Sequence, residues 1–588
     1  MKLYKLSLAL FLGFGAMSMT SCEDKLEVTN PNEQTTGTFG FTSDDLEECV
    51  IAAYHDLRME GSTGRVGYTI DAVRGDEVWN SSQVWYMPFD DMNDPVTDEI
   101  SFWPWREYYY AINVCNFILS RTTGDNAQLS ESMKRIKGQA LFIRGFAYYN
   151  LVGYYKDVPL ITDYSTYSSL DGLYGANNTS DEVLDQVEKD LKEAMELLPN
   201  RQAGGEWAKG RATCGAAAGY YARTLMFRHK YSEALDVLKD IIGGTKYGKY
   251  KLMANYGDNF REGSAYENND ESLFEVQYLD YGTQGVDDEW TPVNVSPNAT
   301  QGHAVESNFA PGDFGGWADL SASPWLYNLF KEERTTAGKL DPRLYWTLGT
   351  YEKEWEGFEN GNVAYTKKIT ATDTLRTNNN YGGIPIAKWT NMRTGLYSSV
   401  ATGLRCGINL RMMRYSDVLL RAAECENEVN GPTEQAIKWI NEVRQRAGLA
   451  DLKLEDFNTK DKLFEQIANV ERPKEFGCEN GRGMDLIRWG FFYDNGRLDQ
   501  LKEHGTFYKN KTIDVKTPVT YAQTKTDPEH VKSSYDTYLP GHEFLPIFQT
   551  LLNNNPNLKG NSANDGIDNS TDFFGRGWTV HPVVDLSK

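Results

Sequence analysis

Residues 211–241 decide the fold class, and they read RATCGAAAGYYARTLMFRHKYSEALDVLKDI. The first half is rich in Ala and Gly from Cys214 to Ala222, and it continues without a break to Phe227. After a short turn, a second half begins at Tyr231 and repeats apolar residues at helical spacing. Small side chains on one helix let a second helix approach closely, so the stretch predicts a tightly packed helix pair.

Apolar stripes predict more helices on both sides of this pair. The residues Ile136, Ala140, Ile143, Ala147 and Leu151 recur at spacings of three and four, and Pro159 ends the pattern. A similar pattern covers Ser180–Leu198, with Ser180 as a cap. A second pair is predicted late in the chain, from Arg411 to Val429 and from Thr433 to Ala447. The pair at 211–241 resembles a tetratricopeptide unit, whose second helix often begins Tyr-x-x-Ala.

The middle of the chain has a different character. Residues 246–405 show no sustained helical period, are rich in Gly, Asn, Asp, Thr and Tyr, and contain a short strand-like run from Leu273 to Tyr278. Long insertions between helices usually serve as binding loops. We therefore expect a mainly α fold in one domain, 36–588. Its helical scaffold would lie mainly in 36–245 and 406–500, and its loop-rich, ligand-binding part in about 246–405 and 501–588.

The amino-terminal residues read as an export signal. Residues 1–21 combine Lys2 and Lys5 with a short apolar segment, which is typical of a signal peptide. Met19-Thr20-Ser21-Cys22 then resembles a lipobox, in which Cys22 is acylated after cleavage; an ordinary secretory peptide is the alternative. Residues 22–35 read as a lipid-anchored tether. We expect an outer-membrane, surface-exposed lipoprotein that meets the membrane only through its anchor.

Charge and aromatic content narrow the partners. The 588 residues include 60 Lys and Arg against 83 Asp and Glu, a formal net charge of −23, which argues against nucleic acid and anionic lipid as main partners. The 14 Trp and 35 Tyr favour wet, amphipathic contact surfaces. Six cysteines beyond Cys22 are scattered without C-x-x-C spacing, so buried free thiols are favoured over a disulfide framework.

The sequence carries no catalytic signature. Phosphate-binding, dinucleotide-binding, zinc-protease and nucleophile-elbow motifs are all missing from it. The seven His residues lie far apart, so no metal site is predicted. The run from Asp565 to Asp572 offers oxygens that could hold calcium, although a solvated acidic turn explains it as well. Carboxylate pairs for glycoside hydrolysis meet only in space, so the sequence leaves a hydrolase open.

Two aromatic clusters are candidate ligand contacts. Sugar rings lay their C–H faces on Trp and Tyr, while Asp, Asn and Arg bind the hydroxyl edges. The first cluster surrounds Trp85, and the second lies between residues 290 and 325. The residues predicted to bind glycan are Arg74, Asp76, Trp79, Trp85, Tyr86, Trp290 and Trp317.

Four segments together resemble the SusD-like (RagB/SusD) family of surface glycan-binding lipoproteins. They are ALFIRGFAYYNLVGYYKDVPL at 140–160, RYSDVLLRAAE at 414–424, ERPKEF with GRGMDLIRWG at 471–476 and 481–490, and FLPI with NPNL at 544–547 and 555–558. Within them, Glu471, Arg472, Asp485 and Arg488 read as scaffold charges that pair between helices, not as an acid–base site.

The resemblance implies four tetratricopeptide-like helix pairs with an irregular remainder that carries the ligand site. It also implies a non-enzymatic protein that captures oligosaccharide or polysaccharide and passes it to a SusC-type TonB-dependent transporter, without a cofactor. A surface-tethered glycoside hydrolase and a peptide-binding uptake lipoprotein of the same fold stay open as alternatives.

Overall fold

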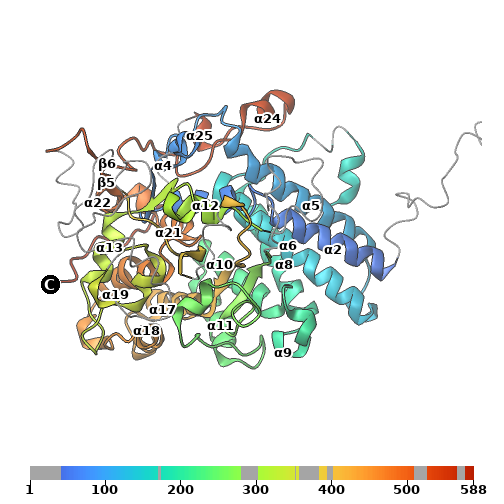
Figure 1. Cartoon of the computed structure of the whole chain (residues 1–588). Helices are drawn as coiled ribbons and strands as arrows, with labels where there is room; N and C mark the ends of the chain where they lie inside the picture. The colour runs from blue at the N-terminus through green and yellow to red at the C-terminus, as the bar shows by residue number, and fades with distance from the viewer. Residues whose placement is uncertain are drawn as a thin grey trace, which may run out of the picture.

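The computed structural model describes residues 42–587 except 82, 170–171, 173, 280–301, 351, 356–382, 394–401, 509–525, 566–571 and 573–575. Eight longer helices make four consecutive pairs that stack in chain order, as the family resemblance implies. The pairs are α2 (Ser43–Leu57) with α5 (Trp103–Arg121), α6 (Glu131–Tyr155) with α8 (Ser180–Leu197), α10 (Cys214–Phe227) with α11 (Tyr231–Gly243), and α17 (Tyr415–Asn430) with α18 (Glu434–Arg446). In Figure 1 they run from α2 in blue at the right, through green α10 and α11, to α17 and α18 at the lower left.

Local sequence signals start and stop these helices. The N-cap of α8 is Thr179, which forms a capping box with Glu182, and not Ser180 as the sequence predicted. The predicted cap Thr433 accepts a hydrogen bond from the amide of Ala436 at the start of α18. After α18, Gly448 adopts φ +75°, a conformation that favours glycine and ends the helix.

The segment before α17 corrects another prediction. Residues 411–414 are not helical, because they belong to the strand β4 (Leu410–Arg414). This strand pairs antiparallel with β2 (Ser272–Val276), which overlaps the run from Leu273 to Tyr278 that the sequence marked as strand-like. The stripe of small residues on α10 lets this sheet approach: a Cβ on Gly219 would lie 2.5 Å from the sulfur of Met413.

Shorter elements pack against the helix pairs, and most of those labelled in Figure 1 lie at its left and top. The helices are α3 (Arg65–Val73), α4 (Met87–Asp90), α9 (Arg201–Gly204), α12 (Val305–Phe309), α13 (Pro324–Lys331), α14 (Pro342–Thr347), α19 (Lys460–Gln466), α20 (Arg472–Phe476), α21 (Arg482–Arg488), α22 (Asn495–His504), α24 (Gln549–Asn554) and α25 (Ser562–Asp565). Two further antiparallel ladders join β1 (Val78–Asn80) to β3 (Leu320–Ala322) and β5 (Thr506–Tyr508) to β6 (Val531–Ser533).

One hydrophobic core runs through the helix pairs and into these shorter elements. The six cysteines that the structure describes are buried free thiols, as predicted. Within the described ranges, no helix is both long and apolar enough to cross a lipid bilayer. The expected signal peptide, Cys22 and the tether at 22–35 lie outside the described residues.

Candidate functional site

A two-stranded ladder brings the two aromatic clusters together. Strand β1 pairs with β3 so that Asn80 lies opposite Leu320, and Ser81 extends the pairing with its amide on the carbonyl of Asp319 at 2.8 Å. Trp85 lies just after β1, in the short helix η2 (Val84–Tyr86), and Trp317 lies just before β3. In an antiparallel pair these two positions leave the ladder at the same end.

Arg65 connects the two indole rings. Its guanidinium carbon lies 5.0 Å from the centroid of the Trp85 ring and 5.4 Å from the centroid of the Trp317 ring. The two rings are therefore within about 10 Å of each other. Both Trp residues are partly exposed, whereas Arg65 is buried against them. Cation–π contacts on two rings at once fix their spacing.

The buried ring of Tyr86 supports the ring of Trp85. The two rings stack with their centroids 3.8 Å apart. The Tyr86 hydroxyl lies 2.6 Å from the hydroxyl of Thr69 and accepts a 2.6 Å hydrogen bond from the side-chain amide of Asn308. Burial raises the pKa of Tyr86, although Arg65 acts to lower it, so the hydroxyl stays neutral at physiological pH.

Helix α12 holds both rings. Asn308 reaches Tyr86, and the carbonyl of the preceding residue, Ser307, accepts the backbone amide of Trp317 at 2.6 Å. The apolar surface continues beside Trp85, where Val84 is 73% exposed and Met87 is 38% exposed. The result is a rigid platform with two partly exposed indoles and an apolar margin, suited to the flat faces of a ligand.

Three predicted ligand residues lie elsewhere in the fold. Trp79 is buried and stacks on Phe507, with a 4.2 Å centroid distance. The buried carboxylate of Asp76 pairs with Arg482 at 2.7 Å, and Arg74 pairs with Asp94 at 2.7 Å. These side chains have no surface left for a sugar, and the candidate site therefore excludes them.

The remaining predicted residues divide into two groups. Trp85 and Trp317 form the platform, and Tyr86 supports it from a buried position. Trp290 lies outside the described residues. Sequence reasoning missed Arg65 and Asn308, since neither stands in a recognisable motif, and only the tertiary contacts place them between the clusters.

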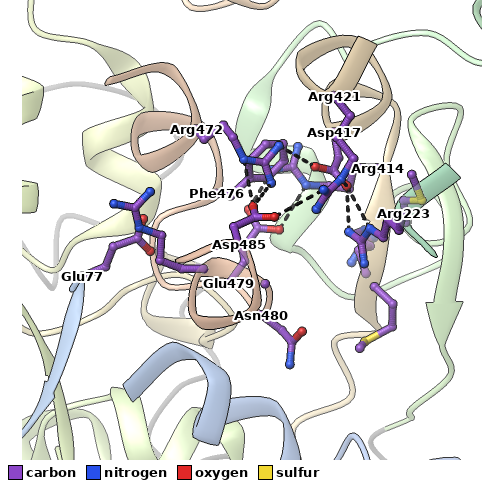
Figure 2. A pocket seen from close by; sticks show the side chains of 15 residues that line it. Glu77, Arg223, Arg414, Asp417, Arg421, Arg472, Phe476, Glu479, Asn480 and Asp485 are labelled. Atoms are coloured by element: carbon purple, nitrogen blue, oxygen red, sulfur yellow. Dashed lines mark hydrogen bonds and ion pairs between the residues drawn. The ribbon is translucent and has the colours of Figure 1, made fainter. Parts of the chain in front are cut away.

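A second polar feature lies deep in the scaffold (Figure 2). Arg223, Arg421 and Arg472 point toward Asp417 at 2.7, 2.8 and 2.8 Å, and Asp485 pairs with Arg472 at 2.6 Å. The cavity between them is about 30 Å³, far smaller than a ligand-binding pocket. The surrounding arginines hold the pKa of Asp417 well below its usual range, against the opposing effect of burial.

This cluster carries the charges that the sequence assigned to the scaffold. Arg488 pairs with Asp485 at 2.7 Å, and Glu471 pairs with Arg444 at 2.7 Å. All of these groups are buried, Arg444 pairs with Glu333 as well, and the cavity lined by Asp417, Arg472 and Asp485 is too small for a ligand. The prediction that these charges pair with one another within the scaffold is confirmed.

The acidic run proposed for calcium is described only in part. Residues 566–571 and 573–575 are outside the described ranges, so the proposal for Asp565 to Asp572 is not tested. Among the residues that are described, no group of three or more His, Cys, Asp or Glu side chains is placed to hold a metal ion.

Known proteins with similar sequences indicate the family of this chain. The model of the SusD family matches residues 270–565, half of the chain, and a model described as starch-binding associating with outer membrane matches residues 24–226. The chain belongs to the SusD family. SusD-like protein P25 of Formosa agariphila is 25% identical over 91% of this chain and 98% of its own length.

Solved structures of SusD-family proteins share the fold. A SusD homolog from Bacteroides thetaiotaomicron superposes with a TM-score of 0.69, at 19% identity over 90% of this chain and 99% of its own. Surface glycan-binding protein A from the same organism, in complex with laminarihexaose, has a TM-score of 0.63 at 21% identity, over 88% of this chain and 99% of its own. The SusD-family scaffold of helix pairs is therefore shown.

Proposed function

We propose that this SusD-family chain binds oligosaccharide or polysaccharide at the cell surface and delivers it to a SusC-type TonB-dependent transporter without cleaving it. The observation that carries the proposal is the platform of Trp85, Arg65 and Trp317. Two indoles within about 10 Å can each take the C–H face of one sugar in the same chain. The relative that binds laminarihexaose supports a glycan as the ligand class.

The membrane location is part of the same proposal. A family model for starch-binding proteins associated with the outer membrane covers residues 24–226, and Cys22 lies two residues before that match begins. Acylation of Cys22 would anchor the chain, and 20 residues separate it from α2. Replacement of Cys22 by Ala should release the protein from the outer membrane and abolish its co-purification with the transporter.

Affinity electrophoresis against a polysaccharide panel tests the binding role, with a reducing-sugar assay on the same mixtures. We expect retardation by at least one glycan and no release of sugar. Trp85→Ala and Trp317→Ala should each weaken binding by about 10- to 100-fold, since each removes a large aromatic contact worth about 1–3 kcal/mol.

Trp207 provides the matched control. It is also partly exposed and also packs against arginines, with Arg135 and Arg211 at 4.9 and 5.5 Å from its ring, but it lies far along the chain between α9 and α10. Trp207→Ala should leave glycan binding unchanged. Sugar release by the wild-type protein would overturn the non-catalytic proposal. Retention of full affinity by the Trp85→Ala, Trp317→Ala double variant would overturn the site.

A further inference from the structure

The charge of the platform is set by one buried ion pair. Arg65 is the cation over both rings, and its guanidinium pairs with the carboxylate of Glu60. The side chain of Arg65 is 3% exposed and that of Glu60 is fully buried. The positive charge beside the indoles is therefore already neutralised within the protein.

This pair is costly to open. An anionic ligand could use Arg65 only by displacing Glu60, which would leave a buried carboxylate without its cation. Loss of one partner from a buried ion pair typically costs several kcal/mol. A new contact between Arg65 and a ligand at a partly exposed position would contribute less binding free energy than that. Arg65 is thus suited to hold the rings and not to receive a carboxylate or a sulfate.

Other carboxylates lie near the platform. Asp319 adjoins β3 next to Trp317, and both Asp319 and Glu60 act electrostatically to raise the pKa of Tyr86 under Trp85. Asp90 accepts the amide of Asn80 at 2.9 Å at the end of β1. Glu60 and Asp319 are thus carboxylates close to Tyr86, and the whole chain carries a net charge of −23. An approaching polyanion therefore meets a negative potential.

We infer that the platform selects uncharged glycans and discriminates against glycans that carry uronate or sulfate groups. The inference rests on the proposed function, because it names the class of glycan that the same site takes. Stacking on Trp85 and Trp317 needs only the apolar faces of the sugars, which both classes share, so the difference between them comes from charge alone.

Matched pairs of polysaccharides test the inference on the mature full-length protein. Suitable pairs share a backbone and differ in charge: laminarin with carboxymethyl curdlan, and hydroxyethyl cellulose with carboxymethyl cellulose. Within the pair that binds, we expect the neutral member to bind at least about 10-fold more tightly at low salt. A higher salt concentration should leave the affinity for the neutral member unchanged. It should reduce the difference in affinity between the neutral and the acidic member.

Two variants connect the preference to the carboxylates. Glu60→Gln removes the anion that neutralises Arg65, and Asp319→Asn removes a second nearby anion but keeps Glu60, the partner of Arg65. Each should reduce the preference for the neutral member by about threefold to tenfold. Asp319→Asn keeps the test decisive if Glu60→Gln does not fold.

The outcomes separate the two claims. Equal or tighter binding of the acidic member, lost on Trp85→Ala, overturns the inference and leaves the proposed function standing. A preference for the neutral member that neither variant reduces also overturns the assignment to these carboxylates. If no glycan of the panel retards the protein, the result contradicts the proposed function and this inference together.

Discussion

Two tryptophans six residues apart lie in opposite environments. Trp79 faces Phe507 inside the fold, whereas Trp85 lies partly exposed beyond the end of β1. Composition and local context mark both as candidate ligand contacts. A contact that is distant in sequence distinguishes them, because Phe507, which stacks on Trp79, lies more than 400 residues after it. The same holds for Asp76, whose cation is Arg482.

The hydroxyl of Tyr86 provides a prediction at the scale of one residue. Tyr86→Phe keeps the ring that stacks under Trp85 but removes the acceptor for Asn308 and the contact with Thr69. The buried amide of Asn308 would lose its partner at Tyr86, so we expect the free energy of unfolding to fall by about 1–3 kcal/mol. Glycan affinity should fall several-fold, because Trp85 loses its fixed support.

Tyr256→Phe is the control for that variant. Its buried hydroxyl donates a 2.7 Å hydrogen bond to the carbonyl of Glu475, so the same chemical group is lost in the scaffold. Stability should fall by a similar amount while glycan affinity stays constant. Equal changes of affinity in both variants, measured by isothermal titration with unfolding in urea, would contradict a positioning role for Tyr86.

At the scale of elements, the long helices were more predictable than the pairing of the strands. Helical periodicity is local, and so the stripes along α6, α8 and α18 appear in the sequence itself. The strand β4 was misread as the start of a helix, since its partner β2 lies about 140 residues earlier. The candidate site depends on the non-local β1–β3 pairing. The aromatic residues could therefore be predicted from the sequence, but their arrangement could not.

Helix α12 provides a prediction about pH. Glu306 is buried and accepts the backbone amide of Asn391 at 2.6 Å, and burial raises its pKa from 4.5 to about 7. The folded protein therefore binds this proton more tightly than the unfolded chain. The associated stability is fully present below pH 4.5 and is lost as the pH rises through about 7.

Glu306→Gln, which carries no charge at any pH, isolates this effect. The variant should be more stable than the wild type at pH 8, by at most about 3 kcal/mol, and should approach the wild type at pH 5. Urea denaturation at the two pH values measures the difference. If the wild type were more stable than the variant and this difference grew from pH 5 to pH 8, the assigned direction of the pKa shift of Glu306 would be wrong.

At the scale of the whole molecule, the sequence motifs of the family converge on one place. The segments 414–424, 471–476 and 481–490 form α17, α20 and α21, and their arginines and carboxylates meet with Arg223 of α10 in the buried cluster of Figure 2. The motifs therefore predicted the fold well. They carried no information about the ligand platform, because its residues lie in segments that the motifs do not include.

Asp485 separates a scaffold role from a catalytic one. It pairs with Arg421, Arg472 and Arg488, which hold its pKa well below the usual range. Its stabilising effect is therefore present at neutral pH and is lost only on acidification through that low pKa. Asp485→Asn should lower the free energy of unfolding at pH 7 by about 3–5 kcal/mol, as expected when a buried ion pair loses one partner.

Glu131→Gln provides the comparison, since Glu131 is 80% exposed and pairs only with Lys134 at 2.8 Å among the described contacts. That variant should leave the free energy of unfolding almost unchanged, because water and salt screen an exposed pair. Folded Asp485→Asn protein should bind glycan as the wild type does, because the cluster lies in the scaffold and the platform is built from α3, η2 and α12. Reducing sugar released by the wild type but not by folded Asp485→Asn would instead assign Asp485 to catalysis, and the scaffold interpretation would be wrong.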